Sequence, residues 1–374
     1  MIRGFRWVRR VAAVWVGCVV LCSGGGVGGA ASSWHEEAVS GEWVTTTSLA
    51  RAGDRVWASA FAVTPDKLES RMLQRERGQW TSVAVPDIGR LGQVSAGSAD
   101  DVWALSQDSN QLLHLTGSSW QVVRPTSDAS VFYSGIAQFG SDVWLAGSRW
   151  SSNTTSVGVV QRRQGQRWVD VPLPDVAPNW QLSQITGTSG HDLWAIGVEF
   201  RSTTDQQTVA LHYDGSTWRK VDSPTGPGRS FVILSAKAFG SHDVWMVGTA
   251  SSAEDGSANH PFAAVFDGYG WTEQKITGDR TRLSGVTKSG DRVLVVGYQL
   301  TTPASPFAVT KTAGTGTWSA AALPATPAGS PGYQLFDALT LRDGSVLLLG
   351  NADQPSTAPD GDPTWRPYAA RGRI

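Results

Sequence analysis

The residues best suited to chemistry are a histidine and an aspartate placed three and two positions before a tryptophan, in the stretch His191–Trp194. A histidine next to a carboxylate is a common pair in acid–base catalysis. The stretch recurs, however, and the histidine position is filled by His242 before Trp245 but by Asp100 before Trp103. A residue type that changes from copy to copy favours a turn role, in which the side chain bonds to the backbone, over catalysis.

Other catalytic and metal-binding patterns are missing from the sequence. Zinc takes three or four converging ligands, often at short spacings, and the six histidines show no such cluster. There is no Ser-His-Asp signature, no phosphate-binding glycine loop and no calcium-loop spacing. We therefore predict no metal, no cofactor and no catalytic residue. The aspartates that recur beside the tryptophans are expected to bind turn amides; they are Asp101, Asp142, Asp192 and Asp243.

One enzymatic alternative stays open. Glycoside hydrolysis needs two carboxylates that face each other across a cleft. Acids in long predicted loops could supply such a pair in a secreted polysaccharide hydrolase or lyase, and they are Glu199, Asp205, Glu254 and Asp255. Nothing in the spacing selects two of them.

Aromatic and basic side chains in the same long loops suit the recognition of sugars or peptides. Trp150 and Trp180 stand out because the repeat described below does not require them. The alternative is that such residues cap a central channel or pack the loops. The candidate ligand-binding residues are Trp150, Trp180, Tyr133, Arg149, Arg201, Arg229, Phe231 and Tyr333.

The elements that must position these residues follow from an internal repeat. Asp-Val-Trp stretches and their relatives occur in seven copies, centred on residues 57, 103, 144, 194, 245, 294 and 347. A second motif, a polar turn ending in tryptophan, follows most copies, as in Asp214–Trp218. Alternating apolar and polar residues before, within and after the two motifs predict four short strands in each unit of about 40 to 50 residues.

Four antiparallel strands in this length form one blade of a β-propeller. The seventh unit ends before a fourth strand, and Ser32–Val39 resembles that strand elsewhere in the chain. We therefore predict an all-β, seven-bladed β-propeller whose N-terminal strand completes the last blade. Residues 32–374 form it, with blades near 44–86, 87–127, 128–176, 177–226, 227–278, 279–326 and 327–374 plus 32–40. The twelve tryptophans of the repeat are expected to fill the space between blades.

The first 31 residues predict an exported protein. Four arginines precede an apolar run at Val11–Cys22, and small residues follow it. That run is short for a membrane span, which needs about 20 residues. The alternative to secretion is anchoring at the cell surface, through an uncleaved signal or through a lipid at Cys22. Cleavage after residue 31 would remove both cysteines and change the formal charge from −1 to −5, which excludes disulfides and argues against nucleic-acid binding. Expected partners are an extracellular glycan, a cell-wall polymer or a protein, and we expect a monomer.

With its Asp-Val-Trp and Asp-Gly-Ser-Thr-Trp repeats, the chain resembles exported bacterial Trp-rich seven-bladed propellers, and more distantly the kelch and galactose-oxidase-like propellers. The resemblance covers residues 32–374 and implies a fold and an export route. The kelch double glycine and the cysteine of a galactose-oxidase site are missing, so no enzyme site is carried over. The export signal, the missing catalytic pattern and the two tryptophans outside the repeat together predict a secreted, non-enzymatic binding module that uses its long-loop face.

Overall fold

The computed structural model describes residues 34–39, 44–64, 66–226, 228–252, 259–312, 314, 316–355 and 364–374. The predicted signal segment, Trp43, Glu254 and Asp255 lie outside these residues. All secondary-structure elements of the described part are β-strands. This part contains no helix long and apolar enough to cross a membrane. All the strands belong to one compact unit, Ser33–Ile374.

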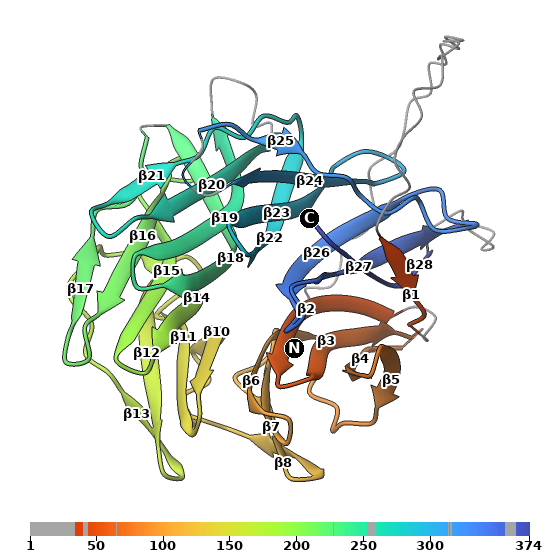
Figure 1. Ribbon diagram of the computed structural model, residues 1–374. Coiled ribbons are helices and arrows are strands. Elements are labelled where there is room, and N and C mark those ends of the chain that lie inside the picture. The colour runs from red at the N-terminus through yellow and green to blue at the C-terminus, as the bar shows by residue number, and fades with distance from the viewer. Residues whose placement is uncertain are drawn as a thin grey trace. The chain divides into compact units, whose positions relative to one another are not determined.

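The strands form seven blades of four antiparallel strands each, which confirms the predicted fold (Figure 1). Two of the blades share one eight-stranded sheet, because Gln206 and Ser230 form a single parallel pair between them. Blade 1 consists of β2 (Val44–Ala52), β3 (Arg55–Val63), β4 (Leu68–Glu76) and β5 (Gln79–Val83). Blade 2 consists of β6 (Leu91–Ser98), β7 (Asp101–Ser106), β8 (Leu112–Thr116) and β9 (Ser119–Val123). Blade 3 consists of β10 (Val131–Phe139), β11 (Asp142–Trp150), β12 (Ser156–Gln164) and β13 (Arg167–Asp170). Blades 4 and 5 are β14 (Trp180–Ser189), β15 (Asp192–Phe200), β16 (Gln206–Tyr213) and β17 (Trp218–Val221); and β18 (Arg229–Gly240), β19 (Asp243–Ser252), β20 (His260–Phe266) and β21 (Trp271–Glu273). Blades 6 and 7 are β22 (Thr281–Ser289), β23 (Arg292–Gln299), β24 (Ser305–Thr312) and β25 (Ser319–Ala320); and β26 (Tyr333–Thr340), β27 (Val346–Gln354), β28 (Thr364–Gly372) and β1 (His35–Glu37).

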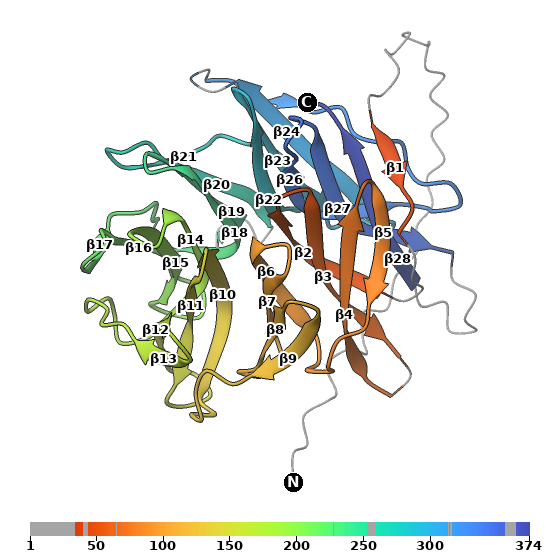
Figure 2. The same ribbon diagram turned by 60° about the horizontal axis from the view of Figure 1, so that its bottom comes forward.

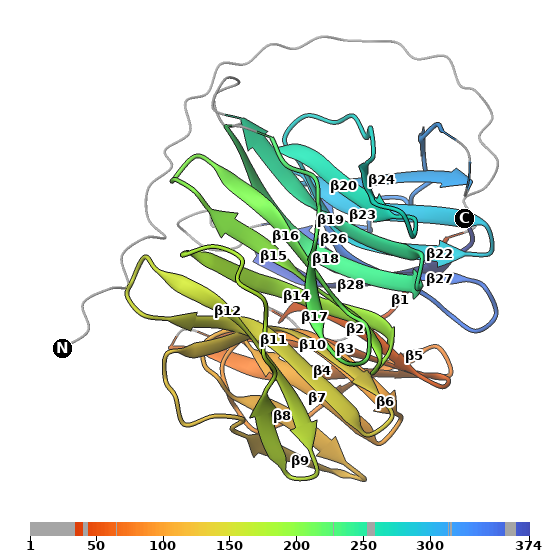
Figure 3. The same ribbon diagram turned by 90° about the vertical axis from the view of Figure 1, so that its left-hand side faces the viewer.

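The N-terminal strand closes the ring as predicted. Strand β1 pairs antiparallel with β28, so the first described strand of the chain is the outer strand of the last blade (Figure 1). The first strands of neighbouring blades contact one another around the ring, including β2 with β26. The turned views show the same cyclic order of blades, with successive sheets lying face to face (Figures 2 and 3).

Strand β1 is held by both neighbouring blades. The indole of Trp34 packs on Gly372 and donates to the carbonyl of Ala322 in the connection after β25, at 2.8 Å. On the other side, Glu37 receives two hydrogen bonds from Arg75, at 2.5 and 2.6 Å. The Glu37 and Arg75 side chains are only 11% and 6% exposed, so this ion pair is buried between blades 7 and 1.

Pairs of repeat tryptophans join neighbouring blades at five places around the ring. Each second-strand tryptophan contacts, edge to face, the fourth-strand tryptophan of the following blade, with ring centroids 5.3 to 6.3 Å apart. Edge-to-face pairs add about 0.5 to 1.5 kcal/mol to the burial of the rings. The pairs are Trp57–Trp120, Trp103–Trp168, Trp144–Trp218, Trp194–Trp271 and Trp245–Trp318.

Candidate functional site

A β-bulge in the first strand of each blade shapes the centre of the propeller. In β10, for example, the pairing with β11 shifts between Tyr133 and Gly135, so Ser134 is left over. A bulge re-aims the side chains beside it. The leftover residues of all seven blades line one cavity, and they are Thr47, Gly92 with Gln93, Ser134, Ser183, Leu234, Ser284 and Phe336.

The repeated glycine of the second strand makes room for this bulged strand. A Cβ atom on Gly197 would lie 1.8 Å from the carbonyl oxygen of Gln181, two residues before the bulge of β14. Real atoms cannot approach so closely, so the position excludes every side chain. The same close approach occurs at Gly147, Gly248, Gly297 and Gly350 in the corresponding blades.

The central cavity, which we call the pit, has a volume of about 390 Å³. It lies at the end of the ring where the fourth strand of one blade connects to the next blade, because its lining comes from the first halves of the innermost strands. Hydroxyl-bearing residues of four bulges and apolar side chains both line its wall. Phe132 and Leu234 are 40% and 36% exposed, and Phe336 packs edge to face on Tyr298. The wall therefore offers both apolar surface and hydrogen-bonding groups.

An ion pair crosses the inner end of the pit. Lys237 of blade 5 reaches past blade 6 and donates to Asp337 Oδ1 and to the carbonyl of Ala338, both at 2.7 Å. The second carboxylate oxygen of Asp337 accepts from the amide of Leu49 in blade 1, at 2.9 Å. An ammonium group has three N–H donors. Two are used among the described residues, which leaves the third donor of Lys237 for a ligand.

Two glutamines also lie at the inner end of the pit, beside this ion pair. Gln184 of blade 4 contacts Gln93 of blade 2 at 3.4 Å and donates to the carbonyl of Leu234 in blade 5 at 3.1 Å. Glycines allow the backbones of the innermost strands of neighbouring blades to approach closely at this level. A Cβ atom on Gly135 would lie 2.9 Å from the backbone of Gln184, and one on Gly285 would lie 2.9 Å from Asp337 Cα. We call Gln93, Gln184, Lys237 and Asp337 the belt.

Four of the predicted binding residues are buried between blades. Trp180 and Tyr133 are 4% exposed, Tyr333 is 1% and Phe231 is 0% exposed. Trp180, for example, packs on Gly158 of the neighbouring blade. The expectation that these side chains face a ligand must be corrected, because side chains alternate along a strand and these lie one position out of phase with the channel. Their neighbours toward the channel are Gln181, Phe132, Gln334 and Val232.

The other four predicted residues reach the surface on three different blades. Arg149 and Trp150 end β11, where Trp150 is half-buried beside Phe132 at an open hollow of about 580 Å³. The three arginines already have carboxylate partners at 2.7 to 3.2 Å: Arg149 with Asp128 and Asp170, Arg201 with Glu199, and Arg229 with Glu273. None of the three lines the pit.

The pit residues Leu234, Phe336, Lys237, Gln184 and Asp337 were not singled out by the sequence. A signal for two of them was present in Leu335–Ala338, where the alternation of apolar and polar residues breaks at the bulge. The ion pair has no such signal, because Lys237 and Asp337 lie 100 positions apart.

The loop carboxylates of the enzymatic alternative are engaged in local contacts where they are described. Glu199 is 12% exposed and pairs with Arg201 at 2.7 Å and with Lys220 at 3.5 Å. Asp205 accepts a hydrogen bond from Gln207. Among the described residues, no group of three or more potential ligands could hold a metal ion.

The histidine–aspartate pairs form inside the blades. His212 Nε2 lies 2.8 Å from Asp192 Oδ1, and the imidazole stacks on Trp194 with centroids 4.6 Å apart. In blade 2, His114 pairs with Asp101 at 2.9 Å, and burial lowers the pKa of His114 against the opposing effect of that carboxylate. The aspartates thus bond side chains, so the expected role in binding turn amides is wrong; Asp142 contacts Arg162, and Asp243 contacts Trp245 and Lys288.

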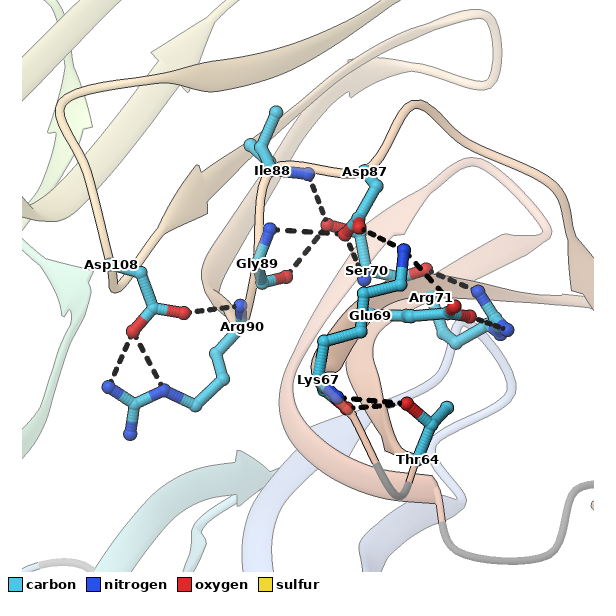
Figure 4. Close-up of polar contacts among 10 residues, drawn as sticks. All are labelled: Thr64, Lys67, Glu69, Ser70, Arg71, Asp87, Ile88, Gly89, Arg90 and Asp108. Carbon is cyan, nitrogen blue, oxygen red and sulfur yellow. Dashed lines mark hydrogen bonds and ion pairs between the residues drawn. The ribbon is translucent and has the colours of Figure 1, made fainter. Parts of the chain in front are cut away.

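Polar contacts also fix the loops that join blade 1 to blade 2 (Figure 4). Asp87 accepts from the amide of Ser70 and from Lys67 Nζ, each at 3.0 Å, and the Ser70 amide is the main cause of its lowered pKa. Arg90 donates twice to Asp108, at 2.6 and 2.9 Å. Each charge has an opposite partner, so the network holds the loops and leaves no free charge for a ligand.

Comparisons with known proteins extend the fold assignment. No protein-family model matches the sequence, and no curated protein matches it. Among solved structures, YCF48 bound to D1 peptide is similar over 92% of this chain and 97% of its own, with 12% identity and a TM-score of 0.57. YCF48 from Cyanidioschyzon merolae has 11% identity and a TM-score of 0.54, over 91% of this chain and 99% of its own.

A puromycin-hydrolyzing peptidase of Mycobacterium tuberculosis is similar over 86% of this chain but only 52% of its own, with 13% identity and a TM-score of 0.54. At such identities a likeness supports the fold alone. The comparisons and the sheet topology together place this chain among the β-propellers.

Proposed function

We propose that this protein is an exported, non-enzymatic binding module that holds a peptide segment of a protein partner in the pit. One observation carries the proposal: seven bulges aim side chains from every blade into a single cavity. Sites shaped in this way, with apolar walls and a few fixed polar groups, are typical of ligand recognition.

The chemistry of the pit favours a peptide. The exposed faces of Phe132, Leu234 and Phe336 suit an apolar side chain, and the free N–H of Lys237 suits a backbone carbonyl or a terminal carboxylate. YCF48, which shares the fold, has been solved with a peptide bound. A carbohydrate is the second candidate, because the hydroxyl residues Ser134, Ser183 and Ser284 line the same cavity as aromatic residues. Export and the monomeric state are expectations from the sequence.

A displayed random-peptide library selected against the immobilised chain, run beside a glycan array, tests this proposal. We expect selected peptides to lose at least tenfold in affinity for Leu234→Ser and Phe336→Ser. Val169→Ser is the matched control, because Val169 is 40% exposed on the outer strand β13, and it should bind like the parent chain.

Two results would contradict the peptide assignment. Peptides whose binding is insensitive to both pit substitutions would place the site elsewhere. Pit-dependent binding on the glycan array, without peptide binders, would make the second candidate correct.

A further inference from the structure

A second cavity lies at the opposite end of the propeller, where the tight turns of blades 7, 1 and 2 meet. It has a volume of about 920 Å³ and is open to solvent. We call it the turn-face cavity. Six arginines line it together with four carboxylates, in a chain whose formal charge is −1. The arginines are Arg51, Arg55, Arg75, Arg77, Arg342 and Arg371.

Two of these arginines have no charged partner among the described residues. Arg51 is the last residue but one of β2, Arg77 lies in the turn between β4 and β5, and both are exposed. Arg55, by contrast, shares its guanidinium between Glu76 at 3.2 Å and Asp100 at 2.9 Å. That pair is one third to two thirds exposed, and such pairs contribute only about 0 to 1 kcal/mol, so an anion could displace its carboxylates at little cost.

The backbone at Arg77 is an independent sign of a site. Its φ angle is +50°, in the left-handed region that favours glycine. The corresponding turns of blades 2 and 3 place Gly117 at +63° and Gly165 at +62° in this position. Blade 1 has an arginine at this position, where blades 2 and 3 have glycine, and residues kept in sparsely populated backbone conformations cluster at ligand sites.

We propose that the turn-face cavity binds a phosphate-bearing anion, with Arg51 and Arg77 as its free guanidinium groups. The proposal is independent of the pit. Carboxylates already stand among these arginines, so an incoming carboxylate would exchange one partner for another of equal charge. A phosphate group carries more charge and more acceptor oxygens, so it can bridge two guanidinium groups at once.

Calorimetric titration of the full chain with inorganic tripolyphosphate at low salt tests the proposal. We expect Arg51→Ser combined with Arg77→Ser to weaken binding at least tenfold. The control is Arg167→Ser combined with Arg219→Ser, which removes the same charge from exposed positions in blades 3 and 4 and should change affinity less than twofold. Glu76→Gln with Asp100→Asn frees Arg55 and should tighten binding about threefold to tenfold.

Further titrations separate the sources of the phosphate. Phosphatidylglycerol vesicles that bind with the same dependence on Arg51 and Arg77 would indicate a lipid headgroup, and binding of tripolyphosphate alone would indicate a soluble anion. Equal loss in the control pair, no binding of either probe, or tighter binding of polyglutamate would overturn the proposal. Leu234→Ser should leave tripolyphosphate binding unchanged, so failure here and failure of the pit are distinguishable.

Discussion

Glu37 is the residue through which the N-terminal strand is fastened to the first blade. Its carboxylate bonds Arg75 twice and accepts from the indole of Trp80 at 2.9 Å. Substitution Glu37→Ala leaves the guanidinium of Arg75, 6% exposed, buried without a counter-charge. Removing one partner of a buried pair costs about 3 to 5 kcal/mol. We therefore expect a large loss of stability.

The matched control is the preceding residue. Glu36 pairs with Arg366 at 2.9 Å, but these side chains are 39% and 26% exposed, so Glu36→Ala should cost about 0 to 1 kcal/mol. The compact unit Ser33–Ile374 has an unfolding entropy of about 0.7 kcal/mol/K at the average value per residue. Glu37→Ala should then lower the melting temperature by about 4 to 7 °C, and Glu36→Ala by about 1 °C or less.

Scanning calorimetry measures both shifts. Pairing Glu37→Leu with Arg75→Met should recover most of the loss, because a buried ion pair replaced by apolar groups is often neutral in stability. Equal melting temperatures for the two glutamate variants would refute the conclusion that the buried Glu37–Arg75 ion pair holds strand β1 in place. A double variant no more stable than Glu37→Ala would show that the loss does not come from a stranded charge.

Two further predictions concern pH and packing. Burial lowers the pKa of His114 below its ordinary 6.5, so the unfolded chain binds this proton more strongly than the folded chain does. The contribution of His114 to the free energy of unfolding is fully present above pH 6.5 and is lost as the pH falls toward the folded pKa. Urea midpoints at pH 7.5 and 5.5 should therefore differ less in His114→Gln than in the parent, and equal differences would contradict this. Gly197→Ala places a Cβ 1.8 Å from a carbonyl oxygen and should cost about 3 kcal/mol in urea unfolding, whereas Gly316→Ala, with nothing within 4 Å, should cost under about 0.5. Similar losses in both glycine variants would argue against the close approach.

The architecture could be predicted because its determinants repeat in the sequence. The tryptophans of the second and fourth strands occur at matching places in successive units, and the resemblance of Ser32–Val39 to a fourth strand located the closing segment. Each of these signals lies within a single unit of the repeat. Period-two patterning therefore sufficed to locate the strands of each blade.

The site could not be predicted at residue level because its phase depends on the bulge. In β26, Tyr333 and Leu335 are buried, whereas Phe336, the residue left over at the bulge, lines the pit. A site prediction that is shifted by one residue along the strand selects a core residue instead, and Tyr333 is an example. The belt was also beyond prediction, since Lys237 and Asp337 meet only through the closure of the whole ring.

Strand β1 has a consequence for how the chain can be made. The ion pair between Glu36 and Arg366 joins residues 330 positions apart. At ribosomal speeds of about 5 to 20 residues per second, the first strand waits roughly 15 to 65 seconds for its partner to be synthesised. Until then the third strand of blade 7 does not exist and the ring has two open edges, which are the surfaces through which β-proteins aggregate. During synthesis the ring therefore cannot close before β28 has been made, and until then its open edge strands can pair with another chain.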